Sequence, residues 1–223
     1  MDPGQPEIEG ASIVLIGSFN PAILHPEWLA ARSLIRSEEA EAGKVEIVSR
    51  QLTVFRLTWL ELQVQDNRFA AHTTDPAHYQ TLQELVLGIF NFLEFTPIEQ
   101  MGMNHHMHFS MEREDDWHKL GDILAPKDVW RDVLPGLRSD GLPGLRTLVM
   151  EGRREGSPAK LARIKVEPSV RLVPGVFFES NEHYEASGTE STAQLLGALR
   201  DCWRDAHVFS RTIGEHLMRS TSR

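Results

Sequence analysis

Two histidines separated by one residue are the clearest candidates for chemistry in this sequence. His106 and His108 form an H-x-H pair, and side chains two residues apart on a β-strand point to the same face. Imidazole nitrogens are common zinc ligands, and Glu112, further along the same face, supplies a carboxylate. The pair therefore predicts a zinc site centred on His106 and His108. The other histidines considered as further ligands are His72, His118 and His183.

A second interpretation of the same strand face is a surface that docks a protein partner. Residues 100–112 alternate between two rows, and the polar row is expected to point away from the core. The binding face predicted from this row, with two residues of another strand, comprises Asn104, His106, His108, Ser110, Gln63 and Gln65. The opposite row, predicted to face the core, comprises Met101, Met103, His105, Met107, Phe109 and Met111. A ligand pocket lined by these methionines is a third hypothesis.

Residues that often act in catalysis have structural interpretations here. His105 lies in the apolar row and is expected to be a buried, structural imidazole. Cys202 lies on the apolar stripe of a helix, which favours a core position over a reactive thiol. The acidic residues around Asp115 and Asp116 are expected to form a solvated turn. No glycine-rich phosphate loop, G-x-S-x-G, H-E-x-x-H or C-x-x-C motif occurs, and these absences favour a non-enzymatic role.

The elements that position these residues follow from hydrophobic periodicity. Alternation predicts strands around residues 45–47, 60–65 and 69–74, and later at 145–151, 160–167 and 175–184. Helices are expected at 27–34, from Pro76 to before Pro97, at 116–124 and at 128–134, whereas the acidic segment 38–43 is expected to be a loop or a frayed helix end. A long amphipathic helix begins near Ser191, and its predicted stripe is Leu195, Leu199, Cys202, Ala206, Phe209, Ile213 and Leu217.

The order of these elements predicts the architecture. Residues 11–96 and 97–223 each read as a strand, a short helix, about three strands and a long helix, so we expect a pseudo-repeat within a single domain, 11–223. The fold class is α+β, with one long antiparallel sheet and both long amphipathic helices on one face. Residues 1–10 hold two prolines and two glycines and are expected to be a disordered tail.

Composition limits the classes of partner. The 223 residues are 41% hydrophobic and carry a formal net charge of -9, with no long basic run, so nucleic acid is not expected as a partner. The single cysteine and the absence of a signal-like N-terminus favour a cytoplasmic location. No apolar run approaches the roughly 20 residues that cross a bilayer, so no membrane span is expected.

Short patterns along the chain resemble a known family. They are the hairpin of residues 62–69, the helix start at Tyr79, the strand after Pro97, and Ala206-His207 with Phe209 and Ile213. Together they resemble a sporadically distributed family of bacterial proteins that has no established biochemical function. The resemblance implies a bacterial protein, and a patchy distribution is compatible with defence-associated genes. The main hypothesis is thus an interaction protein, a subunit of a larger assembly, which docks through the open sheet face or the terminal helix.

Overall fold

The computed structural model describes residues 4–130 and 144–220. Its strands are β1 (Ile8–Gly17), β2 (Lys44–Val48), β3 (Leu52–Arg56), β4 (Glu61–Gln65), β5 (Arg68–Thr73), β6 (Ile98–Ser110), β7 (Leu148–Gly152), β8 (Leu161–Pro168) and β9 (Gly175–Glu185). Its α-helices are α1 (Pro26–Ala30), α2 (Ser37–Ala42), α3 (Tyr79–Phe92), α4 (Glu114–Leu124) and α5 (Ser191–Ser220), with short 3-10 turns η1 (Pro21–Ile23), η2 (Pro76–His78) and η3 (Lys127–Trp130). None of the described helices is long and apolar enough to cross a membrane.

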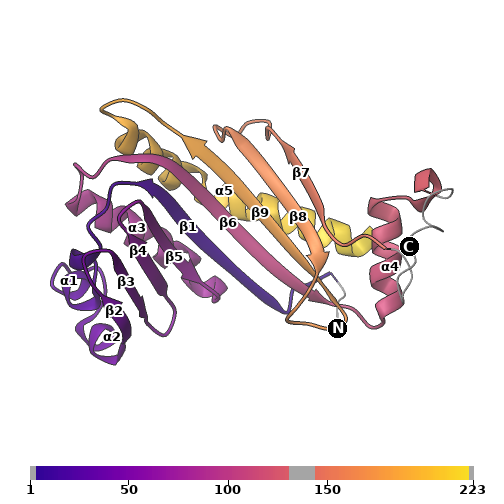
Figure 1. Ribbon diagram of the computed structural model, residues 1–223, viewed down its shortest axis with the longest axis horizontal. Coiled ribbons are helices and arrows are strands. Elements are labelled where there is room, and N and C mark those ends of the chain that lie inside the picture. The colour runs from indigo at the N-terminus through magenta and orange to yellow at the C-terminus, as the bar shows by residue number, and fades with distance from the viewer. Residues whose placement is uncertain (1–3, 131–143, 221–223) are drawn as a thin grey trace.

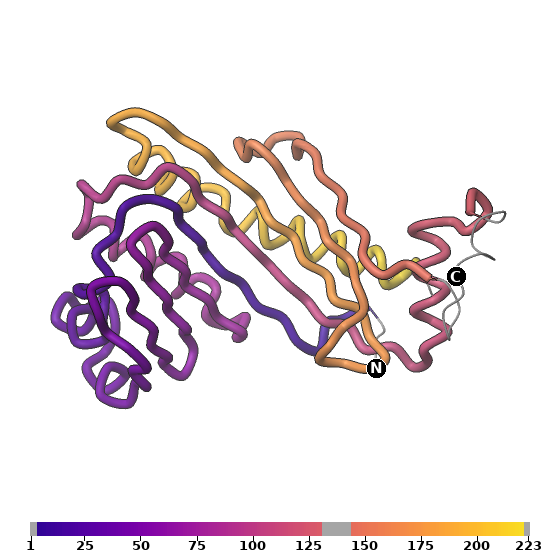
Figure 2. Tube along the Cα trace, in the orientation of Figure 1, coloured from indigo at the N-terminus to yellow at the C-terminus, as the bar shows by residue number. Residues whose placement is uncertain are grey.

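All the described strands join one antiparallel sheet, in the order β2-β3-β4-β5-β1-β6-β9-β8-β7 (Figure 1). The first strand of each half, β1 or β6, lies at the centre, and the two pair with each other. From each of them the chain moves outward and returns by a meander to the central strand, as Figure 2 shows. A long helix, α3 or α5, then follows each meander. The predicted α+β fold with a long antiparallel sheet is therefore confirmed.

The first meander contains one more strand than the three expected, because β3 was not predicted. Its sequence, LTVFR, buries Thr53 beside Phe55 and so breaks the apolar alternation on which the prediction depended. The Thr53 hydroxyl donates a hydrogen bond of 2.8 Å to the carbonyl oxygen of Pro21, which satisfies a polar group that is otherwise expensive to bury. The strand was therefore not predicted, because one of its buried residues is a threonine.

Both long helices pack on the same face of the sheet (Figure 1). The apolar row of β6 supports them, since Met101, Met103, His105, Met107 and Phe109 are all buried, as the period of two predicts. The predicted stripe following Pro76 also lies in the core. Its buried members are Leu82, Leu85, Val86, Ile89 and Phe90, and its last member, Leu93, is half-buried.

The buried stripe of α5 is rotated relative to the prediction. From residue 195 onward its buried residues are Leu195, Leu199, Trp203, Ala206, Ser210, Gly214 and Met218, whereas Cys202 is only half-buried. Gly214 shows the reason, because a Cβ atom there would lie 2.9 Å from Cε of Met107. Small residues let the helix axis approach the bulky row of β6. A search for apolar periodicity does not detect such positions, because they carry no large apolar side chain.

Several local predictions need correction. The chain is ordered before residue 11: β1 begins at Ile8, and the Glu7 N–H donates to the carbonyl oxygen of His108 over 2.9 Å. The acidic segment forms helix α2, where the Arg36 N–H donates to Glu39 Oε2 over 2.9 Å. Helix α1 ends at Ala30 instead of residue 34, and β6 runs from Ile98 to Ser110 instead of from 100 to 112. The helix expected at 128–134 lies mostly outside the described residues.

Candidate functional site

The face of the sheet opposite α3 and α5 is the candidate site, because none of the described helices packs on it. One residue from each described strand contributes to a row of polar side chains across this face. Each member of the row is paired in register with the next member on the neighbouring strand. From one edge to the other the row is Lys44, Arg56, Glu61, His72, Ser12, Asn104, Asn181, Arg163 and Glu151. We call these residues the polar row.

Hydrogen bonds connect the centre of the polar row. Asn181 Nδ2 donates to Asn104 Oδ1 over 2.5 Å, and Asn104 Nδ2 donates to Ser12 Oγ over 3.1 Å. These three side chains come from β9, β6 and β1, so the chain of hydrogen bonds fixes amide and hydroxyl groups over the middle of the sheet. Fixed donors and acceptors of both kinds suit recognition of another polar surface.

A pair of opposite charges lies on either side of this centre within the row. Arg56 Nε donates to Glu61 Oε2 over 3.0 Å, and Arg163 Nε donates to Glu151 Oε1 over 2.6 Å. Four of the five charged members of the polar row thus form two neutral pairs, so this row is not the stripe of positive charge that a binder of nucleic acid would present.

Two imidazoles lie side by side next to the centre of the row. The rings of His72 and His106 are nearly parallel, with centroids 5.5 Å apart and an interplanar angle of 25°. Gly10 of β1 makes room for them: a Cβ atom at Gly10 would lie 2.5 Å from His106 Cε1 and 2.8 Å from the carbonyl oxygen of Thr73. The glycine assigned to a tail from the sequence is thus a position of close approach in a central strand.

These imidazoles are neutral at physiological pH. The pKa of His106 is lowered to about 4, mainly by burial and in smaller part by the neighbouring His72 and His108. Burial is also the main cause of the lowered pKa values of His72 and His108. The face thus presents imidazoles that accept or donate hydrogen bonds without adding positive charge.

His108 is less available than the period of two suggested. It is only 4% exposed, and its Nδ1 lies 2.8 Å from Ser169 Oγ in the segment between β8 and β9. Its ring also packs against Phe177, with centroids 4.9 Å apart. Contact with this segment, which no sequence pattern places near β6, explains why an outward-facing histidine is buried.

The other predicted site residues are dispersed. Ser110 is exposed at the end of β6, while Gln63 and Gln65 lie on β4, separated from β6 by β5 and β1. His72 joins His106, but His118 lies beside Gly144 and His183 contacts Glu185. Ser12, His72 and Asn181 complete the centre of the polar row, and their only signal in the sequence is a polar residue at an alternating position.

The two predicted zinc ligands, His106 and His108, lie near each other, but no third ligand lies beside both of them among the described residues. The rings of His106 and His108 are 6.2 Å apart at 80°. Within residues 4–130 and 144–220, no three side chains of His, Cys, Asp or Glu gather in the manner of a metal site. Since a structural zinc site takes four protein ligands and a catalytic one takes three, the zinc hypothesis stays a prediction that needs direct measurement.

On the helix side, His105 is buried as predicted. It is 2% exposed and contacts Trp203 and His207, both with ring centroids 4.9 Å away. Burial lowers the pKa of His105 to about 3, and the nearby His207 and His106 contribute to the shift. Its Nε2 atom has no hydrogen-bond partner among the described residues. Cys202 is half-buried, and burial raises the pKa of its thiol, which opposes thiolate chemistry.

Comparison of the chain with models of protein families and with curated proteins finds no match.

Proposed function

We propose that this protein is a non-enzymatic interaction protein, a subunit of a larger assembly, and that the open sheet face is its docking surface. The observation that carries the proposal is the polar row, which crosses all the described strands and has fixed hydrogen-bonding groups at its centre. Such a row offers a wide and polar surface, and none of its members is a nucleophile hydrogen-bonded to a neighbouring base.

The partner that fits this surface is another protein. Amide, hydroxyl and neutral imidazole groups at the centre match the donors and acceptors of a polypeptide surface. The ion pairs Arg56–Glu61 and Arg163–Glu151 leave the flanks electrostatically balanced, which disfavours a polyanion. The net charge of -9 opposes association of two copies, so we favour a different chain as the partner.

Photo-crosslinking in a bacterial host tests this proposal. A photoreactive residue at Gln63 or Glu179, both on the open face, is expected to capture one discrete protein, whereas the same residue at exposed Gln80 of α3 captures none. The captured protein is then purified and its affinity measured. Equal capture from both faces, or capture of a second copy of the chain alone, contradicts the proposal.

A matched pair of substitutions gives the quantitative result. Asn181→Asp adds a negative charge to the hydrogen-bonded centre with almost no change in volume, and we expect it to weaken the affinity for the purified partner about tenfold or more. Asn91→Asp makes the same chemical change at an exposed position of α3 and is expected to leave the affinity unchanged. Equal affinities for the two variants would exclude the centre of the polar row from the interface.

A metal-binding role is the second candidate, favoured by the neighbouring rings of His72 and His106, whose centroids lie 5.5 Å apart. His72, His106 and His108 have lowered pKa values, so at pH 7 each ring is neutral and keeps one nitrogen lone pair free of a proton. If this role is correct, untagged protein contains zinc on elemental analysis, and added zinc raises its unfolding midpoint but not that of His106→Ala. If the face only docks a protein, zinc affects neither sample.

A further inference from the structure

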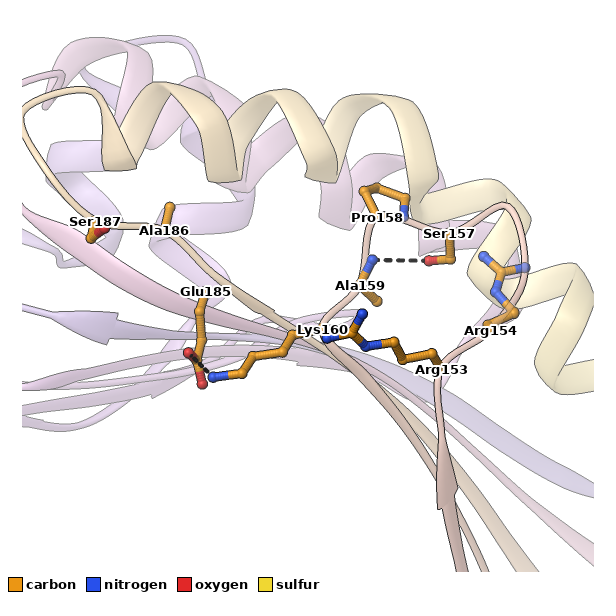
Figure 3. A pocket seen from close by; sticks show the side chains of 9 residues that line it. All are labelled: Arg153, Arg154, Ser157, Pro158, Ala159, Lys160, Glu185, Ala186 and Ser187. Carbon is orange, nitrogen blue, oxygen red and sulfur yellow. Dashed lines mark hydrogen bonds and ion pairs between the residues drawn. The ribbon is translucent and has the colours of Figure 1, made fainter.

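A pocket of about 630 Å³ lies beside the turn that joins β7 to β8 (Figure 3). Its lining includes Arg153, Arg154, Ser157, Lys160, Glu185 and Ser187. A neighbouring pocket of about 480 Å³ shares Arg153, Lys160 and Glu185 and adds Leu161, Arg163 and Asn181. Because the two share these residues, they adjoin, and the second reaches Asn181 in the polar row of the open face.

A buried carboxylate holds the turn in shape. Glu182 of β9 is 1% exposed, yet its Oε1 lies 2.7 Å from Arg154 Nε. Its Oε2 accepts hydrogen bonds from Tyr184 Oη at 2.7 Å and from Ser157 Oγ at 3.1 Å. Arg154 and Ser157 belong to the turn, so Glu182 fixes both of its sides, and the pocket is formed before any ligand arrives.

A second ion pair ties the turn to α5. Arg154 Nη1 lies 2.7 Å from Asp205 Oδ2, and the Arg154 guanidinium packs over the ring of Phe209 at 4.7 Å. Figure 3 shows Arg154 and Ser157 on the side toward α5, with the Lys160–Glu185 ion pair on the opposite side. The walls of the pocket thus rest on β9 and α5, which are regular elements.

The lining leaves one cation without an internal partner. The carboxylates near the pocket are each engaged: Glu182 by Arg154, and Glu185 by Lys160 and by His183, whose Nε2 lies 3.0 Å from Glu185 Oε1. Arg153, by contrast, has no ion-pair partner in the parts of the chain that the structure describes. In a protein with a net charge of -9, a guanidinium without an internal ion pair beside a pocket marks a place for an anion.

We propose that this pocket binds a small organic phosphate, with the phosphate held by Arg153 and Lys160 and the organic part lying toward Leu161 and Asn181. A guanidinium presents a fork of N–H donors that matches phosphate oxygens, and an ammonium adds a point charge. The hydroxyls of Ser157 and Ser187 lie in the same lining as further donors. The volume exceeds that of a phosphate ion alone and falls in the range of sites for small organic ligands.

Calorimetric titration with pyrophosphate and inorganic phosphate at constant ionic strength tests the site. We expect saturable binding of both, tighter for pyrophosphate because two phosphate groups engage more of the cations. Arg153→Gln should weaken the binding of pyrophosphate about tenfold or more, since a charge-assisted pair of hydrogen bonds is lost. The variant should fold normally, because this arginine has no internal ion pair to lose.

Arg50→Gln is the matched control. Arg50 lies between β2 and β3, far along the sheet from β7, and is exposed, so its replacement makes the same change in charge away from the pocket. We expect its affinity for pyrophosphate to equal that of the unaltered protein. Absence of saturable binding to the unaltered protein, or equal weakening by both variants, would overturn the proposal. The test requires no protein partner, so its failure leaves the docking proposal standing.

Discussion

Replacing Arg154 with alanine is expected to lower the free energy of unfolding by about 3–5 kcal/mol, because it leaves the buried Glu182 without its cation. The Arg154 side chain is 11% exposed and that of Glu182 1%, so the guanidinium is the charge that compensates a carboxylate withdrawn from bulk water. The contact with Asp205 adds little to this value, since that carboxylate is 68% exposed. Urea unfolding at pH 7, followed by circular dichroism, measures the loss.

Arg163→Ala is the matched control for this prediction. Arg163 pairs with Glu151 on the open face, but both side chains are more than a third exposed. Exposed pairs contribute about 0–1 kcal/mol, so the control should change stability only slightly. A similar small effect for Arg154→Ala would contradict the assignment of Glu182 as a buried carboxylate that depends on its partner.

A double variant separates the unpaired charge from lost packing. Glu182→Gln keeps an acceptor for the hydroxyls of Tyr184 and Ser157 but removes the negative charge. Added to Arg154→Ala, it should recover part of the lost stability, because no buried charge then remains unpaired. If the double variant is less stable than Arg154→Ala alone, the loss comes from packing of the arginine side chain and not from the charge.

The sequence predicts the sheet better than it predicts which strands meet. Alternation in β6 identifies Met101, Met103 and Phe109 as core and Asn104 as outward, because the side-chain period of a strand is two and one face is buried. Register between distant strands has no comparable signal. The pairing of Ser12 with Asn104 and His72 therefore appears only in the structure, and with it the polar row.

The remaining differences between prediction and structure arise at buried positions that are occupied by small or polar residues instead of apolar ones. Gly10 and Gly214 make room for His106 and Met107, and both are invisible to a hydrophobicity pattern. Glu182 lies in the buried row of β9, where alternation alone expects an apolar residue, and its partner Arg154 comes from a turn. Such sites depend on tertiary contacts, which local periodicity does not encode.

Stability is also expected to fall steeply in mild acid because of His105. A histidine whose pKa is lowered on folding stabilises the folded state while the imidazole is neutral. This contribution is complete at pH values above the pKa of the unfolded state, and it is lost as the pH falls toward the pKa of the folded state. The pKa of His105 is about 3 when folded against 6.5 in the reference state, so the loss extends from about pH 6.5 down to pH 3. Each pH unit within this window costs up to about 1.4 kcal/mol.

The surroundings of His105 offer no compensation for a proton. Its ring contacts those of Tyr79, Trp203 and His207, and the pKa of His207 is itself lowered by burial and by Arg211. Glu9, a carboxylate near this cluster, is engaged by Arg211, with Nη1 to Oε2 at 3.2 Å. Protonation thus places a positive charge in an apolar layer that already adjoins a cation.

His105→Leu tests this account, because leucine fills a similar volume and cannot be protonated. At pH 7 we expect the variant to match the unaltered protein or exceed its stability by about 1 kcal/mol, since the unpartnered Nε2 atom is removed. At pH 5 its advantage should grow by about 2 kcal/mol, because only the unaltered protein pays for keeping that imidazole unprotonated. Urea unfolding between pH 7 and pH 4.5 gives both values. Parallel stability curves for the two proteins would show that the acid sensitivity lies elsewhere, for example at His106, whose pKa of about 4 makes it the next group to oppose protonation.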